Sequence, residues 1–153
     1  MKITDLKKKA GKFTLQIEDL TLEEGAVHGF VGGNGCGKTT LAKLIMGILP
    51  SDSGRIDLGK LSNLEMTMTS QRPYLLHKSV YENIIFPLKI RKWEIDDGFI
   101  EEMLEACGLL EKKNQYARSL SSGERQKVSL IRALIFKPKL IIIDETFSNM
   151  DIE

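Results

Sequence analysis

The chain has 153 residues, 42% of them hydrophobic and 28% charged, and its net charge of +1 gives no global reason to expect a nucleic-acid partner. Its two cysteines, Cys36 and Cys107, lie far apart and form no Cys-x-x-Cys pair, which favours a reducing compartment over a disulfide framework. No run of about 18 apolar residues occurs, so we expect no membrane-spanning segment. A basic run, Lys7 to Lys9, indicates a solvated surface turn.

Short apolar patterns in the first half of the chain indicate strands around one helix. Residues 13–17 alternate apolar and polar side chains, and residues 26–31 form a short apolar run, so we expect a strand at each. A glycine-rich turn follows the second run. It leads into a helix whose apolar residues share one face and which ends before Pro50. Residues 55–58 and 64–69 are expected to form further short strands.

The second half of the chain is predominantly helical until its last strand. Residues 79–117 read as a helical insert, with a helix at 98–107. Ser121 and Glu124 have the spacing of a capping box and open an amphipathic helix. The apolar run LIIID, residues 140–144, is typical of a buried strand. This order predicts an α/β domain with a mainly parallel sheet, interrupted by a helical lobe.

A glycine-rich segment has the pattern of a phosphate-binding loop, G-x-x-x-x-G-K-[ST]. Glycines let successive backbone N–H groups point at one anion, and a helix N-terminus adds partial positive charge. The lysine of such a loop reaches the β- and γ-phosphates, and the hydroxyl that follows it can ligate Mg²⁺. The predicted ATP-binding residues of this segment are Gly32, Gly33, Asn34, Gly35, Cys36, Gly37, Lys38, Thr39 and Thr40.

Two adjacent acids follow the buried strand. Asp144 ends the LIIID run, at the edge of the sheet where open α/β folds bind ligands, and we expect it to hold the magnesium through water. Glu145 would then face the γ-phosphate and polarise the attacking water. With Lys38, these acids predict an ATP-hydrolysing site.

At this point the sequence resembles the nucleotide-binding subunits of ABC transporters, over nearly the whole chain. Beyond the two general motifs, the resemblance rests on LSSGE at residues 120–124, which is similar to the family's LSGGQ signature. Gln71 stands at the place of the Q-loop glutamine, and SNMD at 148–151 stands at the place of the D-loop. Residues 71–92 look importer-like, which favours import.

The resemblance implies a single ABC-type nucleotide-binding domain over residues 1–153. Residues 1–70 and 118–153 would form the ATP-binding core, a P-loop NTPase fold, and about 71–117 the helical subdomain. The family's switch histidine lies beyond the D-loop, whereas both histidines of this sequence lie upstream of Glu145. We therefore expect the C-terminal part of the core, with that histidine, to be missing.

The resemblance also assigns roles to individual residues. ATP would lie between the phosphate loop of one domain and the signature of a second, in a head-to-tail dimer with itself or a paralogous subunit. Gln71 would sense the γ-phosphate and contact Mg²⁺, and Phe13, the aromatic residue of the first expected strand, would stack on adenine. The signature residues expected to reach the partner's nucleotide are Ser121, Ser122, Gly123 and Glu124, with Asp151 of the D-loop beside them.

Two substitutions distinguish this signature from the family pattern. Ser122 replaces the usual second glycine and adds a side chain where backbone approaches closely. Glu124 replaces the usual glutamine and adds a negative charge near the start of a helix, where it would face phosphate oxygens of the nucleotide.

These features predict an ATPase with ATP and Mg²⁺ as cofactors, located in the cytoplasm at the inner face of the cell membrane. Its partners would be transmembrane permease subunits and no nucleic acid. Three alternatives remain open from the sequence. The chain could bind ATP without efficient hydrolysis, it could be a soluble ABC-type ATPase, or, more distantly, it could be a P-loop kinase that would not need the LSSGE element.

Overall fold

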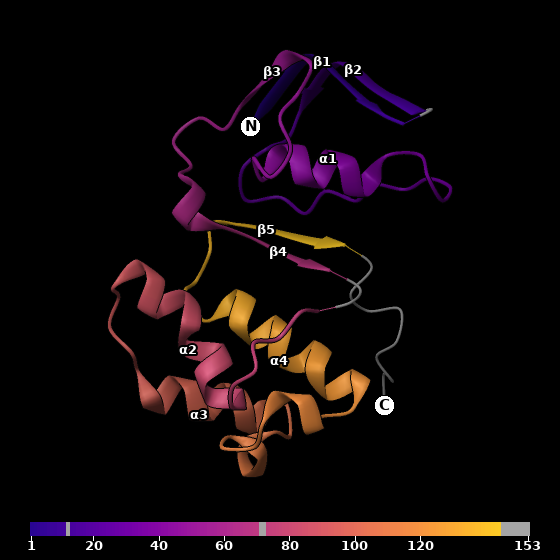
Figure 1. Ribbon diagram of the computed structural model, residues 1–153. Coiled ribbons are helices and arrows are strands. Elements are labelled where there is room, and N and C mark those ends of the chain that lie inside the picture. Colours follow the sequence, from indigo (N-terminus) through magenta and orange to yellow (C-terminus); the bar gives the residue numbers. More distant parts are fainter. Residues whose placement is uncertain (12, 71–72, 145–153) are drawn as a thin grey trace. The chain divides into compact units, whose positions relative to one another are not determined.

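The computed structural model describes residues 1–11, 13–70 and 73–144, and the chain divides into two compact units, Met1–Met66 and Thr67–Glu153 (Figure 1). Each unit is described on its own. No helix in the described ranges is both long and apolar enough to cross a bilayer. The elements of the first unit are β1 (Lys2–Ala10), β2 (Phe13–Thr21), α1 (Lys38–Ile45), β3 (Ser53–Asp57) and the 3-10 turn η1 (Asn63–Glu65).

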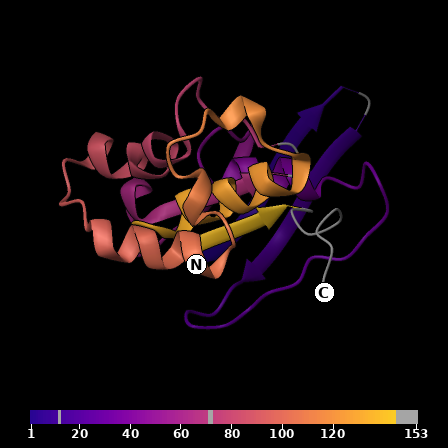
Figure 2. The same ribbon diagram turned by 90° about the horizontal axis from the view of Figure 1, so that it is seen from below.

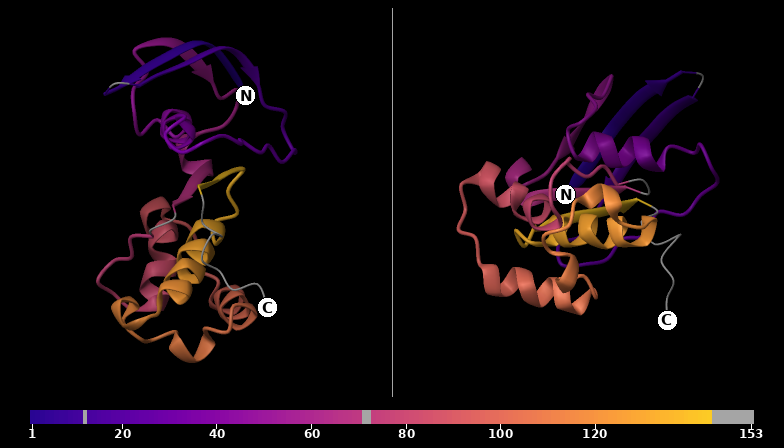
Figure 3. Two further views of the ribbon diagram at one scale, coloured as in Figure 1. Left: turned by 90° about the vertical axis from the view of Figure 1, so that its right-hand side faces the viewer. Right: turned by 60° about the horizontal axis from the view of Figure 1, so that its bottom comes forward.

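The first unit is an antiparallel sheet covered on one face by a helix. Its strand order is β2-β1-β3, and both pairings are antiparallel. Helix α1 lies beneath this sheet in the views of Figures 1 and 3. Ile3 and Leu6 of β1 are fully buried, and the apolar residues of α1 that share one face are also buried (Leu41, Ala42, Leu44 and Ile45). Burial of this face holds the helix in place, since a helix of eight residues is marginal by itself.

A bulge in β1 explains why Ile3 and Leu6 both point into the core although they are three residues apart. The register between β1 and β3 shifts between Thr4 and Lys7, and Asp5 has a left-handed φ of 50°. The extra residue restores the inward direction for Leu6. The expected surface turn at Lys7 to Lys9 is therefore wrong, because these residues continue β1.

The expected strand at residues 26–31 is also wrong. The structure has no strand there, and Val27 and Val31 are fully exposed. A strand needs a neighbour to accept its backbone hydrogen bonds, and an apolar run does not specify one. Within the first unit, the sheet is completed by β1, β2 and β3, and this segment pairs with none of them.

The second unit is built on helices that enclose an apolar core. Its elements are β4 (Met66–Ser70), α2 (Val80–Arg91), α3 (Asp97–Ala106), the 3-10 turns η2 (Leu110–Lys112) and η3 (Ala117–Ser119), α4 (Ser122–Leu134) and β5 (Leu140–Asp144). The core combines Val80, Ile84 and Leu88 of α2, Ile100 and Leu104 of α3, and Val128 and Ile131 of α4. Tertiary packing of these faces thus joins the predicted insert to the helix that follows it.

Strands β4 and β5 form a two-stranded sheet. Their arrows point the same way in Figure 1, so the pair is parallel, and α4 lies over one face of it (Figures 1 and 2). The expected α/β class is confirmed, with parallel pairing in this unit and antiparallel pairing in the first. The predicted division of the core at residues 70/71 and 117/118 stays a prediction.

Candidate functional site

The phosphate-loop segment forms a tight turn that leads directly into α1. Gly35 and Gly37 have φ values of 79° and 101°, a left-handed conformation that glycine adopts without strain. Gly37 is also the N-cap of α1, and a Cβ at this position would lie 2.9 Å from Cε1 of Phe13. Position 37 therefore requires glycine both for its backbone conformation and for space.

Lys38 folds back over this loop. Its Nζ donates hydrogen bonds to the carbonyl oxygens of Gly32 at 2.7 Å and Gly33 at 3.0 Å, and it lies 3.7 Å from Sγ of Cys36. The ammonium is thus held inside the curl of the loop, where a phosphate bound by the loop's N–H groups would meet it.

The N-terminus of α1 offers backbone donors to an anion. The first turn of α1 has no acidic residue, and within the described residues no side chain caps it. The partial positive charge of this helix start therefore faces the loop without a competing carboxylate. Gly37 is buried, and Phe13 is partly exposed. The other predicted phosphate-binding residues are exposed or partly exposed: Gly32, Gly33, Asn34, Gly35, Cys36, Lys38, Thr39 and Thr40.

Strands β4 and β5 end at the same edge of their parallel sheet, at Ser70 and Asp144 (Figure 1). The structure therefore brings together the two chain positions that immediately precede Gln71 and Glu145. Gln71, Glu145 and Asp151 themselves lie outside the described residues. Their predicted roles stay predictions.

A magnesium ion would need oxygen ligands, and the residues predicted for it have them. Thr39 supplies a hydroxyl at the start of α1, and Asp144 supplies a carboxylate at the end of β5. Hydroxyl, carboxylate and water oxygens are the ligands that Mg²⁺ prefers, so the donor types fit. The described part of the chain contains no cluster of three His, Cys, Asp or Glu side chains.

The signature segment opens α4 with the predicted capping box. Ser121 is the N-cap, and its Oγ accepts a hydrogen bond from the Glu124 N–H at 3.3 Å. In return, Oε2 of Glu124 accepts from the Ser121 N–H at 2.9 Å, and Oε1 accepts from Nζ of Lys112. These two donors lower the pKa of the Glu124 carboxyl below its ordinary value of 4.5, with the Lys112 bond the larger cause.

The same helix start also presents two backbone donors. Ser122 and Gly123 occupy the first two helical positions, where N–H groups have no intrahelical partner. Neither N–H group has an acceptor among the residues that the structure describes. The segment is exposed at Ser121 and Ser122, so these donors are available to a ligand from outside the chain.

Two residues that matter at this site were not predicted from the sequence. Lys112 reaches Glu124 from a 3-10 turn twelve positions earlier. Asn83 of α2 is fully buried and binds both backbone groups of Leu76, in the segment that follows Gln71. The first contact depends on how the turn η2 lies beside α4, and the second on how the segment before α2 folds back on it, and periodicity predicts neither.

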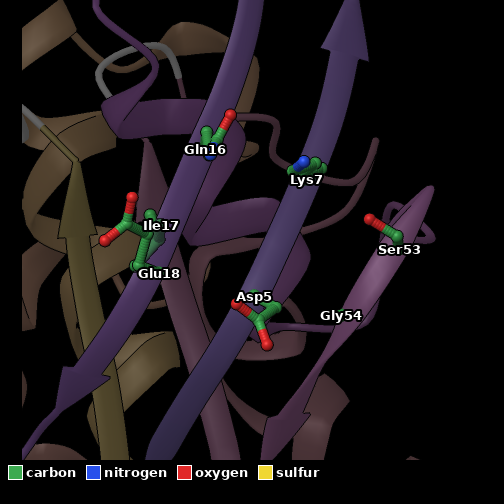
Figure 4. Close-up of a pocket in the computed structure, with 7 residues that line it drawn as sticks. All are labelled: Asp5, Lys7, Gln16, Ile17, Glu18, Ser53 and Gly54. Atoms are coloured by element: carbon green, nitrogen blue, oxygen red, sulfur yellow. The ribbon is translucent and has the colours of Figure 1, made fainter.

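The residues of the phosphate-loop motif line neither of two cavities found in the structure. One of about 400 Å³ opens beside the β1 bulge, and Figure 4 shows its polar lining, which includes Asp5, Lys7 and Glu18. The other, of about 440 Å³, is a groove in the second unit lined by residues of β4, α2 and α4 together with Tyr74, Leu76 and Phe136.

Comparison with known proteins identifies the family to which the chain is similar. The sequence profile of the family described as "ABC transporter" matches residues 15–148. The tungstate uptake system ATP-binding protein TupC of Peptoclostridium acidaminophilum is 39% identical over 99% of this chain and 74% of its own. The spermidine/putrescine import ATP-binding protein PotA of Fusobacterium nucleatum subsp. nucleatum is 37% identical over 87% of this chain, which spans 38% of PotA.

A solved structure confirms the fold. The chain superposes on cbiO1 from Clostridium perfringens, described as part of the ABC transporter complex cbiONQ, with a TM-score of 0.74 and 25% identity. The match covers 98% of this chain and 66% of cbiO1. The α/β P-loop NTPase class expected from the sequence is therefore confirmed, and the chain belongs to the ABC transporter family, in which it matches the ATP-binding subunits.

Proposed function

We propose that the chain is the ATP-binding subunit of an ABC transporter, which binds Mg-ATP and couples its hydrolysis to transport through membrane subunits. The observation that carries this proposal is the position of Lys38, held in the curl of a glycine loop at the uncapped start of α1. The names of the similar proteins TupC and PotA, an uptake and an import subunit, support import as the direction.

Each predicted site residue would have a separate role in binding or hydrolysing ATP. The loop N–H groups and Lys38 bind the β- and γ-phosphates. Thr39 and Asp144 hold Mg²⁺, which neutralises charge on the phosphates when bound. Glu145 orients and polarises the attacking water, and Gln71 senses the γ-phosphate. The shared edge at which β4 and β5 end supports placing the last two roles side by side.

The signature would act on the nucleotide of a second copy. Ser121 and the free N–H groups of Ser122 and Gly123 form an anion-binding helix start. In a head-to-tail dimer, this helix start would contact the γ-phosphate held by the partner's loop, with Asp151 crossing the interface nearby. ATP would then act as the link between the two copies.

The groove of about 440 Å³ in the second unit is our candidate for the permease contact. Its lining includes the exposed apolar side chains of Tyr74, Phe86 and Ile90. Apolar patches of this kind mark protein interaction sites. Binding there would place the subunit at the inner face of the membrane, and would connect it to the segment after Gln71.

Binding and turnover test the proposal separately. We expect calorimetry to show Mg-dependent ATP binding that Lys38→Ala weakens by at least about tenfold, since a charge-assisted contact to phosphate is lost. Lys43→Ala, on the exposed face of the same helix, is the matched control and should bind normally. Glu145→Gln should keep binding and lose turnover. Equal affinity of the wild type and Lys38→Ala would refute the binding site, and unchanged turnover in Glu145→Gln would refute the assignment of the base.

A further inference from the structure

The carboxylate of Glu124 lies at the start of α4, beside the free N–H groups of Ser122 and Gly123. A carboxylate in the first turn stabilises a helix through its dipole, but it also repels any other anion that approaches the same N-terminus. Because two hydrogen bonds lower the pKa of this carboxyl, it is fully ionised near neutral pH. A signature with an ionised glutamate therefore needs a neighbouring cation if it is to bind phosphate.

Lys112 provides that cation. Its Nζ donates to Oε1 of Glu124, while Oε2 is occupied by the Ser121 N–H. The two side chains are 36% and 24% exposed, so solvent screens their pairing less than it screens a surface ion pair.

The turn that carries Lys112 is itself fixed. The backbone N–H of Lys112 donates to the carbonyl oxygen of Leu109 at 2.9 Å, and its carbonyl accepts from Gln115 at the same distance. The Leu109 side chain is almost completely buried in the helical core. The backbone that presents Lys112 to Glu124 is thus held by hydrogen bonds and by burial of Leu109.

We propose that Lys112 is a positioning residue for the signature motif. By pairing with Glu124, it cancels the negative charge at the start of α4 and holds the carboxylate in the capping box. The N–H groups of Ser122 and Gly123 can then donate hydrogen bonds to a phosphate oxygen of the nucleotide bound to a second copy. This inference rests on the proposed head-to-tail dimer.

The experiment measures pairing of the chain by analytical ultracentrifugation, as a function of the concentration of Mg²⁺ and a non-hydrolysable β,γ-imido analogue of ATP. Lys112→Gln removes the cation but keeps a side chain of similar length. We expect this variant to need about tenfold more analogue for half-maximal pairing, a shift that shrinks as salt screens the exposed charge. Lys112→Arg keeps the charge and should pair at close to the wild-type concentration.

A double-mutant cycle separates this role from a general loss of stability. In a Glu124→Gln background there is no charge to cancel, so adding Lys112→Gln should change the half-maximal concentration by less than about twofold. Lys113→Gln is the matched control, because Lys113 pairs with Glu101 at 2.8 Å instead of with the signature helix. Thermal unfolding by circular dichroism checks that each variant is folded.

The outcomes separate the inference from the proposed function. If Lys112→Gln pairs like the wild type, or if its defect persists unchanged in the Glu124→Gln background, the inference is wrong and Lys112 is a structural residue. A wild-type chain that binds a fluorescent ATP analogue but does not pair with it also overturns the inference, while nucleotide binding stands. A wild-type chain that does not bind the analogue refutes the proposed function itself, and the inference with it.

Discussion

Gly54 of β3 packs so closely against the bulged residue Asp5 of β1 that a Cβ at Gly54 would lie 2.3 Å from the Asp5 carbonyl oxygen. Gly54 also has a left-handed φ of 77°, so both its conformation and its surroundings exclude a side chain. We predict that Gly54→Ala lowers the free energy of unfolding by about 2–4 kcal/mol, because backbone must move to relieve the contact. Urea denaturation followed by circular dichroism measures this loss.

Gly59 provides the control for Gly54. It has a similar φ of 63°, but nothing lies within 4 Å of the position that its Cβ would take. Gly59→Ala should therefore cost only the conformational strain, about 1 kcal/mol. Equal losses in the two variants would show that the contact with Asp5 contributes nothing.

Asn83 connects α2 to the segment that follows Gln71. Its Oδ1 accepts from the Leu76 N–H at 2.7 Å, and its Nδ2 donates to the carbonyl oxygens of Leu76 at 3.2 Å and Ser79 at 2.8 Å. Asn83 is fully buried, so Asn83→Ala leaves backbone groups unpaired, and we predict a loss of about 2–3 kcal/mol in unfolding free energy.

Hydrogen exchange can locate the effect of Asn83→Ala. The Leu76 N–H should lose protection in the variant more than amides in α3 do, because its acceptor is removed. Asn114→Ala, at an exposed position, should change unfolding free energy by less than about 0.5 kcal/mol. Uniform loss of protection across the second unit would contradict a local tether.

The sequence predicted the structural elements that are specified by turn residues or hydrophobic periodicity within one short segment. The capping box of Ser121 and Glu124, the strand at residues 140–144 and the loop that leads into α1 were all predicted, because turn chemistry and periodicity specify them. Strand β1 was missed because the bulge at Asp5 breaks the alternation of apolar residues.

Features that depend on a distant partner could not be predicted. Residues 26–31 have the composition of a strand but no partner within their unit, and pairing is not encoded in the segment itself. The Lys112–Glu124 pair likewise arises only when the turn η2 lies beside α4, and the contacts of Asn83 arise only when residues 76–79 fold back on α2. The signature motif could thus be recognised from sequence, whereas the residue that neutralises its charge could not.

The pairing of Glu124 predicts a pH dependence of stability. Because its pKa is lower in the folded protein than the ordinary value of 4.5, the carboxylate stabilises the fold above that value, and the contribution is lost as pH falls through the lower folded pKa. We predict that the difference in unfolding midpoint between the wild type and Glu124→Gln is larger at about pH 7 than at about pH 3.5. Glu101→Gln, at a carboxylate that is 53% exposed, should show a smaller change over the same range. A constant Glu124→Gln difference would mean that the pair does not stabilise the folded chain.

The ring of Phe13 lies against Gly37 at the end of the phosphate loop, which leaves two roles to distinguish. If it stacks on adenine, as the family resemblance implies, only ligands that contain the base depend on it. If it merely supports the loop, every phosphate ligand depends on it equally.

Stacking of a base on an aromatic ring contributes about 1–3 kcal/mol, so we predict that Phe13→Leu weakens ATP binding by about tenfold or more and leaves binding of inorganic tripolyphosphate unchanged. Leucine keeps an apolar side chain against Gly37, which preserves the loop. Calorimetric titration of both ligands decides the matter, and equal weakening of the two would assign the ring to loop packing and exclude it from adenine recognition.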